Sequence, residues 1–223
     1  VKGYSTHSVA QVTMSLVLSL MTHLTEYCNS VKSGEYQKSG IENRLTPVFH
    51  EICGKTFGVV GLGNIGRQVA KIAEAFGCKV LCFKRTPDPN YCCVDLETLL
   101  KNSDIVTLHL PLSDQTEKII GEKELSLMKP NAILVNVSRG AVTDEKSVAD
   151  AIKNHIIGGF ATDVYSVEPM EENSPLAEIK DMPNVLLTPH MAWGAYESRI
   201  RCIEEIAQNI SAFIRNEKRN RIV

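Results

Sequence analysis

The sequence of 223 residues has no uninterrupted apolar run as long as a transmembrane helix requires. Its most apolar stretch, residues 12–24, is interrupted by polar side chains at Thr13, Ser15, Ser19, Thr22 and His23. At the start of the chain, no basic segment leads into an apolar core and a cleavage site. We therefore expect neither a signal peptide nor a membrane partner.

Cysteines with metal-binding or redox spacing are also missing. The seven cysteines are an odd number, and none belongs to a C-x-x-C motif. No cluster of His, Cys, Asp and Glu has the spacing of metal ligands, so we predict no bound metal. This cysteine pattern favours a reduced, cytoplasmic protein.

The chain has no large excess of charge of either sign. It contains 24 Lys and Arg against 26 Asp and Glu, a net charge of −2. A local basic cluster at residues 215–221 includes Glu217 and is interpreted as a solvated terminus. Without a basic stripe we expect no nucleic-acid partner.

A glycine-rich turn between a strand-like and a helix-like segment is the main motif. The turn is Gly61-Leu62-Gly63-Asn64-Ile65-Gly66, after the strand-like residues 56–60. An apolar-periodic run follows over residues 65–76, with Val69, Ile72, Ala73 and Phe76 on one face. Gly77 stands where a helix commonly ends, and residues 79–83 form a second strand-like run. This pattern predicts the βαβ unit of a dinucleotide-binding fold.

Each glycine has a separate expected task. Gly61 permits the tight turn, Gly63 lets a pyrophosphate approach the backbone, and Gly66 lets the helix pack on the strand. The helix N-terminus at Asn64 and Ile65 offers free N–H groups to phosphates. An ordinary turn that uses glycine for geometry alone is the competing interpretation, and the complete strand–helix–strand context favours dinucleotide binding.

The rest of the chain alternates between strand and helix patterns. Residues 5–28 are expected to form one long helix with an apolar stripe, and residues 30–47 a polar loop. Further strands are expected at residues 105–110, 132–137, 159–164 and 185–188, and helices at 96–101, 123–128, 145–154 and 195–216. Asp95 and Asp144 are candidate N-caps. The alternation predicts an α/β fold with a doubly wound, mostly parallel Rossmann-type sheet and helices on both faces.

Unusual polar residues follow the later strands, where open α/β sheets bind ligands. They are Arg139, Asp163, Glu168, and His190 in the run Pro189-His190-Met191-Ala192-Trp193. With these motifs, residues 3–11 and the loop 109–113, nearly the whole chain resembles the D-isomer-specific 2-hydroxyacid dehydrogenases. The run around His190, together with residues 31–35, is most similar to the glycerate dehydrogenase (hydroxypyruvate reductase) branch.

The resemblance implies a role for each of these side chains. His190 would be the general acid in reduction and the base in oxidation, and Glu168 would orient its ring and favour its protonated form. Arg139 would bind the substrate carboxylate and polarise the C2 carbonyl. Asp163 would lie near the nicotinamide, Pro111 would contact the cofactor, and the cofactor would supply the hydride.

Each side chain also has a simpler explanation. Arg139 could be a surface residue, Glu168 a loop carboxylate and His190 a satisfied core histidine. The combination in the family's order favours catalysis. We therefore expect an NAD(P)-dependent oxidoreductase acting on small D-2-hydroxy and 2-oxo acids, such as hydroxypyruvate or glyoxylate. D-lactate dehydrogenase or another D-2-hydroxyacid dehydrogenase is an alternative, and a corepressor-like dinucleotide sensor without turnover is an alternative from another class. His109 is expected to be structural.

The cofactor's ribose site departs from the pattern of NAD enzymes. About 20 residues beyond the glycines, those enzymes carry an Asp or Glu that binds the ribose 2′-OH. This sequence has Lys84-Arg85-Thr86 there. Two cations and a hydroxyl would attract a 2′-phosphate, so NADP(H) is favoured over NAD(H).

The domain organisation also differs from that of the family. Residues 1–194 are expected to form the dinucleotide-binding domain, including the leading helix of residues 5–28. Residues 195–223 would form a helix that returns to a substrate domain whose N-terminal segment the sequence does not contain. The stripe on residues 9–24 would then lack partners unless another chain covers it, and the resemblance implies a homodimer through that helix.

Overall fold

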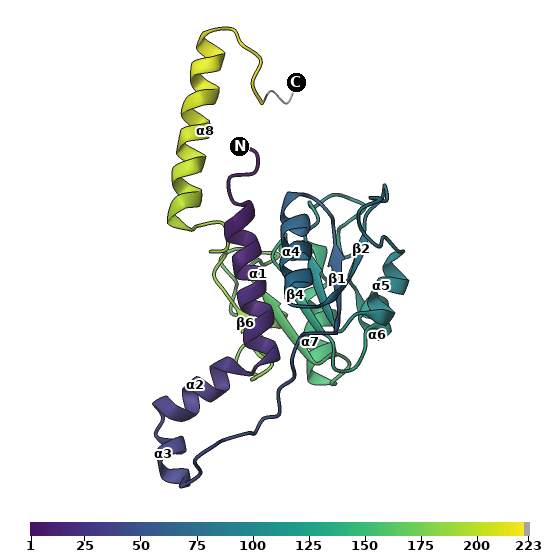
Figure 1. Cartoon of the computed structure of the whole chain (residues 1–223), viewed down its shortest axis with the longest axis vertical. Coiled ribbons are helices and arrows are strands. Elements are labelled where there is room, and N and C mark those ends of the chain that lie inside the picture. The colour runs from purple at the N-terminus through teal and green to yellow at the C-terminus, as the bar shows by residue number, and fades with distance from the viewer. Residues whose placement is uncertain (221–223) are drawn as a thin grey trace.

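The computed structural model describes residues 1–220 and has a six-stranded parallel sheet at its centre (Figure 1). The strands are β1 (Thr56–Val60), β2 (Lys79–Phe83), β3 (Ile105–Leu108), β4 (Ile133–Asn136), β5 (Gly159–Thr162) and β6 (Val185–Leu187). Their order is β2-β1-β3-β4-β5-β6. From β1 the chain winds out to β2 and then returns to β3 on the other side. This reversal creates a crevice beside β1, where doubly wound sheets bind nucleotides.

Helices cover both faces of the sheet, as the alternating pattern predicts. One face carries α1 (Thr6–Met21) and α4 (Asn64–Ala75), and the other carries α5 (Leu96–Asn102), α6 (Glu122–Leu127) and α7 (Glu145–Lys153). Two short 3-10 helices, η1 (Gly140–Val142) and η2 (Pro175–Glu178), lie in later loops. Phe57 and Val59 belong to the first core, and Leu108 and Leu134 to the second. The α/β fold is therefore confirmed.

Two predicted helix starts are confirmed by their side chains. The carboxylate of Asp95 accepts a hydrogen bond from the Thr98 N–H at 2.8 Å. Asp144 accepts from the N–H groups of Lys146 and Ser147. These caps satisfy backbone donors that the first helical turn leaves free.

The single helix expected over residues 5–28 is wrong. The chain forms α1 and α2 (Leu24–Lys32), which are bent by 68° relative to each other. His23 adopts a left-handed φ of 51°, and its N–H donates to the Leu20 carbonyl three residues back, so the helical ladder ends there. No single helix among residues 1–220 is long and apolar enough to cross a membrane; the bent pair reaches the length, with the apolar side of α1 packed on the sheet.

The polar loop expected at residues 30–47 is also partly wrong. The helix α2 continues to Lys32, and a turn at Gly34 with φ of 76° leads into α3 (Glu35–Ser39). Figure 1 shows α2 and α3 as an arm that extends from one end of the molecule. Only the following segment, residues 40–55, is irregular.

The apolar stripe on α1 does not lack partners. Val9, Leu16, Val17 and Leu20 are buried against α4 and the sheet of the same chain. Leu24, at the end of the expected stripe, begins α2 and is 52% exposed. The expectation that the stripe needs another chain is therefore wrong.

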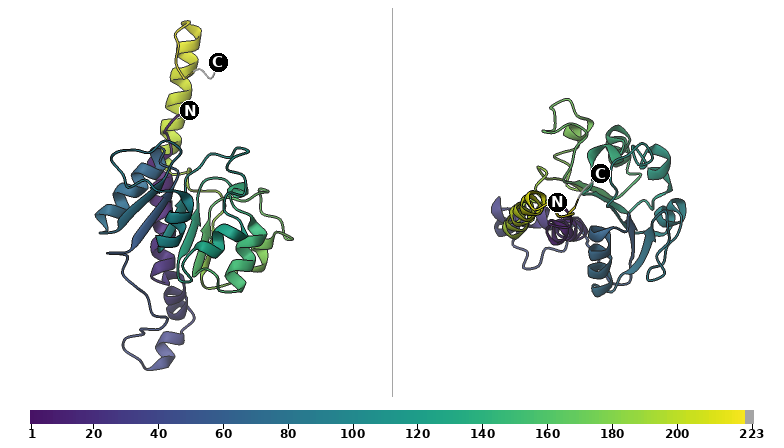
Figure 2. Two further views of the ribbon diagram at one scale, coloured as in Figure 1. Left: turned by 90° about the vertical axis from the view of Figure 1, so that its right-hand side faces the viewer. Right: turned by 90° about the horizontal axis from the view of Figure 1, so that it is seen from above.

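The apolar side chains of the last helix, unlike those of α1, are exposed. Helix α8 (Tyr196–Ile214) stands away from the sheet (Figure 2), and its apolar residues Ile203 and Phe213 are 64% and 74% exposed. The end of the expected segment 195–223, including Arg221 of the basic cluster, lies outside the described residues. Phe76, expected on the buried face of α4, follows the end of that helix and is 44% exposed.

Candidate active site

Two pockets lie along the carboxyl ends of the strands. The glycine pocket, of about 600 Å³, is lined by the turn after β1 and the residues after β2. The His190 pocket, of about 400 Å³, is lined by residues that follow β4, β5 and β6. The two pockets share His109, Leu110 and Pro111, so they are parts of one cleft. Both volumes are in the range of small-molecule sites.

The glycine turn has the geometry that its sequence predicts. Gly61 has φ of +99°, and a Cβ there would lie 2.6 Å from the His109 carbonyl oxygen. At Gly66 a Cβ would lie 2.0 Å from the Gly61 oxygen, so Gly66 serves packing and lines neither pocket. Gly63 is different, because a Cβ there would meet nothing within 4 Å. The protein's own packing does not require a glycine at 63, whereas a ligand that approaches the N-terminus of α4 would.

The other residues assigned to the cofactor divide between the two pockets. Asn64, Lys84, Arg85 and Thr86 line the glycine pocket, Ile65 and Asp163 line the His190 pocket, and Pro111 lines both. The backbone at the N-terminus of α4 and the adjacent cations therefore fit a dinucleotide that extends along the cleft.

Arg67 is a further cation in the glycine pocket that sequence reasoning missed. Its guanidinium is paired with Asp88 at 2.5 Å and lies over the Tyr91 ring. The Asn90 N–H and the Arg67 guanidinium hold the pKa of Asp88 below its usual range. Asp88 therefore remains ionised but is turned toward Arg67. Among residues 1–220, no carboxylate lines this pocket.

His190 and Glu168 are joined by a hydrogen bond at the edge of the His190 pocket. The His190 Nδ1 lies 2.6 Å from a Glu168 oxygen, and the other oxygen accepts from the Tyr165 N–H. Burial raises the pKa of Glu168, but the His190 and Tyr165 hydrogen bonds and the Arg139 charge outweigh it and lower that pKa. With Nδ1 bound to the carboxylate, His190 Nε2 is the ring nitrogen available to exchange a proton with a ligand.

Asp163 holds the loop that carries His190. The side chain is almost fully buried, and one oxygen accepts from the Thr188 hydroxyl at 2.7 Å and the Met191 N–H at 2.9 Å. The other oxygen accepts from the Ala192 N–H at 2.8 Å. These bonds lie on both sides of His190, whose φ of 51° is unfavourable for a side chain larger than glycine. The resemblance gave no hint of this loop-holding contact.

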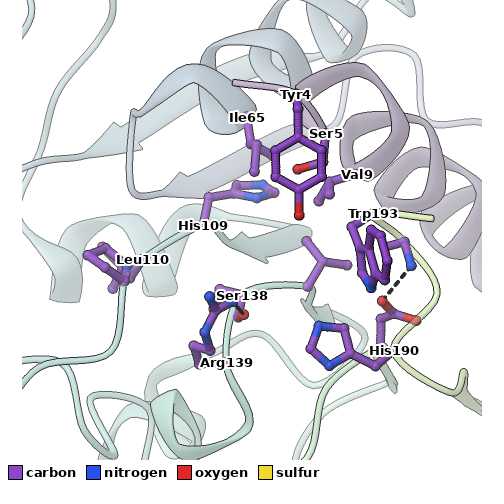
Figure 3. A pocket seen from close by; sticks show the side chains of 14 residues that line it. Tyr4, Ser5, Val9, Ile65, His109, Leu110, Ser138, Arg139, His190 and Trp193 are labelled. Carbon is purple, nitrogen blue, oxygen red and sulfur yellow. Dashed lines mark hydrogen bonds between the residues drawn. The ribbon is translucent and has the colours of Figure 1, made fainter. Parts of the chain in front are cut away.

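Arg139 is placed across the pocket from His190 (Figure 3). The buried Asn136 at the end of β4 accepts from the Ser138 N–H and hydroxyl, and its amide donates to the Arg139 carbonyl. Arg139 Nη1 donates to the Ser138 carbonyl at 2.6 Å. Asn136 therefore fixes the turn, and the guanidinium keeps other donors for an anion.

Tyr4 and Trp193 form an aromatic wall that sequence reasoning did not assign. Their rings meet edge to face, with centroids 6.4 Å apart, and both line the His190 pocket. Figure 3 shows the Tyr4 hydroxyl directed into this pocket. Both residues stood in motifs that carry the resemblance, and Trp193 is the only tryptophan in the chain.

His109 connects the two pockets. Its Nε2 lies 3.0 Å from the Thr107 hydroxyl, and its buried Nδ1 has no partner among the described residues. The residue is half-buried, but burial of the ring lowers its pKa to about 3. His109 is therefore neutral near pH 7. In residues 1–220, no group of three or more His, Cys, Asp or Glu side chains could hold a metal ion.

Comparisons with known proteins agree with this geometry. Residues 14–192 match the model of the D-isomer specific 2-hydroxyacid dehydrogenase, NAD binding domain. The chain belongs to the D-isomer-specific 2-hydroxyacid dehydrogenase family. A glyoxylate reductase of Thermococcus litoralis is 41% identical over 96% of this chain and 66% of its own length. A glycerate dehydrogenase of Methylorubrum extorquens is 36% identical over 99% of this chain and 69% of its own length.

A solved structure of the same fold is that of the acyclic imino acid reductase Bsp5, in complex with NADPH and D-Arg. It is 32% identical and superposes with a TM-score of 0.87 over 99% of this chain and 69% of its own. The chain thus spans about two thirds of the length of the relatives that it matches. The family predicted from the sequence is confirmed, and its members bind nicotinamide dinucleotides.

Proposed function

We propose that this protein reduces a small 2-oxo acid of the hydroxypyruvate or glyoxylate type to the D-2-hydroxy acid. The observation that carries the proposal is the meeting of Arg139 and the His190–Glu168 pair in a pocket continuous with the glycine pocket. The glycerate dehydrogenase and glyoxylate reductase relatives support this substrate class. The comparisons give no support to a dinucleotide sensor without turnover.

A bound nicotinamide dinucleotide would supply the hydride that is added to C2. Arg139 would pair with the substrate carboxylate and withdraw electron density from the C2 carbonyl. His190 Nε2 would deliver the proton to the carbonyl oxygen, while Glu168 stabilises the imidazolium beforehand. Asp163 would keep the His190 loop in position and contribute negative charge near the nicotinamide.

Steady-state assays would test this assignment. The purified protein is incubated with either reduced dinucleotide and with hydroxypyruvate, glyoxylate or pyruvate. We expect the highest kcat/KM with one of the first two substrates. A preference for pyruvate would favour the D-lactate alternative, and no oxidation of either dinucleotide with any of the three would contradict an enzymatic role.

We propose NADP(H) as the preferred cofactor. Lys84 and Arg85 line the glycine pocket, whose described lining has no carboxylate to repel a 2′-phosphate. The relative crystallised with NADPH supports this choice, whereas the name of the family model refers to NAD. Calorimetric titration with NADPH and NADH measures the preference directly.

We also propose a homodimer. Because the apolar side of α1 is buried in its own chain, the α2–α3 arm would form the interface. The arm and the segment after it expose apolar side chains, namely those of Leu24, Val31, Ile41, Leu45, Val48 and Phe49. A two-fold pairing would cover this surface. Light scattering should report twice the chain mass at micromolar concentration, and Leu24→Asp with Val31→Asp should yield the monomer.

Residues 1–194 would then form the dinucleotide-binding domain. The exposed apolar face of α8 would pack on a substrate domain. The relatives are longer than this chain by enough residues to include such a domain. A cytoplasmic location remains a prediction from the sequence, and cell fractionation tests it.

A further inference from the structure

The base of α8 is tied to the N-terminal segment by an arginine. Arg201 Nε donates to the Tyr4 carbonyl at 3.1 Å, and its Nη2 donates to the Ser198 hydroxyl at 3.1 Å. Ser198 is fully buried. The same guanidinium therefore bonds within α8 and to a segment 197 residues away in the sequence.

The residue that Arg201 holds belongs to the wall of the His190 pocket. The Tyr4 ring packs edge to face on Trp193, and both side chains line the pocket (Figure 3). A second tie lies close by, because the Ser8 hydroxyl donates to the Ala192 carbonyl and accepts from the Ala195 N–H. The segments that enter and leave the sheet domain are thus joined around Trp193.

Apolar packing does not set the direction of α8. Its large side chains, including Ile203, Ile210 and Phe213, are mostly exposed, and the helix extends away from the sheet. The polar ties at its base are therefore what orients the helix relative to Tyr4. A charged guanidinium bound to a backbone carbonyl is stronger and more directional than a neutral pair.

We propose that Arg201 is a positioning residue that holds Tyr4 against Trp193, so that the direction of α8 determines how this aromatic wall closes the His190 pocket. The inference rests on the proposed function only in naming the occupant as a small 2-oxo acid. The arrangement links a helix outside the sheet domain to the pocket that contains His190. Movement of α8 would change substrate binding without changing the dinucleotide site, because the hydrogen bonds of Arg201 go to Tyr4 and Ser198 and not to the glycine turn or Lys84.

Fluorescence of Trp193 tests the placement of the wall without any assay of activity, because the chain has no other tryptophan. We expect Arg201→Met to shift the emission to longer wavelength and to increase quenching by acrylamide. Tyr4→Leu, which removes the partner ring, should shift both in the same direction. Arg199→Met is the matched control, because Arg199 is an exposed arginine on the same turn of α8. This variant should have the same Trp193 emission as the parent protein.

The enzyme assay separates positioning from general stability. Arg201→Met should raise the KM for the 2-oxo acid about three- to tenfold, the scale of one aromatic pair, with kcat and dinucleotide affinity unchanged within about twofold. Arg201→Lys, which can reach one acceptor but not both, should lie between the parent and Arg201→Met. If Arg201→Met does not fold by circular dichroism, Arg201→Lys carries the same comparison.

The fluorescence and the enzyme assay test different proposals. An Arg201 variant whose Trp193 emission matches Arg199→Met would overturn the positioning role, even in an active enzyme. A parent protein without turnover would contradict the proposed function, whereas the fluorescence comparison would still decide whether Arg201 holds the wall.

Discussion

The two ends of the cleft are constructed differently. At the His190 end, buried polar groups hold the segments of His190 and Arg139: Asp163 fixes the loop of His190, and Asn136 fixes the turn of Arg139. At the ribose end, Lys84 is half-buried and Arg85 is exposed, with a 3.3 Å hydrogen bond to Gln115. Proton transfer needs groups within a few tenths of an ångström, whereas charge attraction tolerates mobile side chains. The His190 end is therefore held by more buried hydrogen bonds than the end at Lys84 and Arg85, which fits proton transfer at the first and charge attraction at the second.

This difference predicts a gradient of effects along the cleft. Changes at the His190 end should affect turnover strongly, and changes at the ribose end should affect only the choice of cofactor. Exposed charge pairs contribute at most about 1 kcal/mol each, which limits what Lys84 and Arg85 can do.

The largest effect is expected for His190→Ala. Loss of a positioned acid should lower kcat by about two to four orders of magnitude, because His190 Nε2 is the group that we assign to give a proton to the carbonyl oxygen. Calorimetry should show unchanged dinucleotide affinity. His50→Ala, an exposed histidine in the segment before β1, serves as the control. Near-normal turnover of His190→Ala would mean that another residue or water delivers the proton.

His109, which both ends share, should make the fold sensitive to acid. Its pKa of about 3 in the folded chain lies below the ordinary value of 6.5, so unfolding takes up a proton. This part of the stability is present above pH 6.5 and is lost as the pH falls toward 3. Between pH 6.5 and 4.5 it removes about 2 kcal/mol from the free energy of unfolding. Urea titrations at both pH values, without dinucleotide, should show that His109→Gln loses less stability than the parent; equal losses would contradict this.

In the glycine turn after β1, substitutions at Gly63 and Gly66 should have different effects. Gly63→Val places a branched side chain in open space, so the fold should persist while dinucleotide affinity falls about tenfold to a hundredfold, the equivalent of an overpacked contact. Gly66→Ala forces a Cβ against the Gly61 oxygen and should lower the free energy of unfolding by about 1–3 kcal/mol. Thermal melts and calorimetry distinguish the two outcomes. Unchanged dinucleotide affinity of Gly63→Val would contradict the assignment of the cofactor to this turn.

Glu168→Gln tests the electrostatic part of the His190 end. The lowered pKa of Glu168 keeps its carboxylate ionised below pH 4.5, so throughout the neutral range it favours the imidazolium of His190. Reduction requires that imidazolium, and its rate must fall as the pH rises and the proton is lost. Without the negative charge the imidazolium is less favoured, so the fall should begin at a lower pH. The pH profile of kcat/KM measures the shift, and an unmoved profile would show that Glu168 only orients the ring.

Prediction from sequence was most successful where a backbone requirement leaves a residue signature. The glycine turn, the caps at Asp95 and Asp144, and the residues after β4 to β6 could be placed, because strand ends of a parallel sheet meet at one edge. The contacts of Asp163 could not be predicted, since two of its partners are backbone N–H groups that carry no signature. Tyr4 and Trp193 stood in recognised motifs, but only the fold shows that they meet.

The helices α1 and α8 show the limit of amphipathic patterns. Both have an apolar stripe, which predicts that one face of the helix will be covered. The stripe does not predict whether the same chain or another partner covers it. The chain itself covers the stripe on α1, and that on α8 remains exposed. The break at His23 escaped prediction because the apolar spacing continues across it to Leu24, and only the left-handed backbone ends the helix.

The smallest effect is expected at the ribose end. Lys84→Asp places a carboxylate where NAD enzymes carry one, so NADPH affinity should fall about three- to tenfold while NADH affinity stays level or rises. The loss is modest because Lys84 is partly solvated, and Arg85 and Thr86 remain to bind the 2′-phosphate. Lys71→Asp, on an exposed position of α4, makes the same change in net charge away from the pocket and should leave both affinities nearly unchanged. Added salt should reduce the difference between the parent and Lys84→Asp, because exposed charges are screened. If the parent already binds NADH tenfold better than NADPH, the NADP(H) preference is wrong, and the cations at this end are solvated loop residues beside an NAD site.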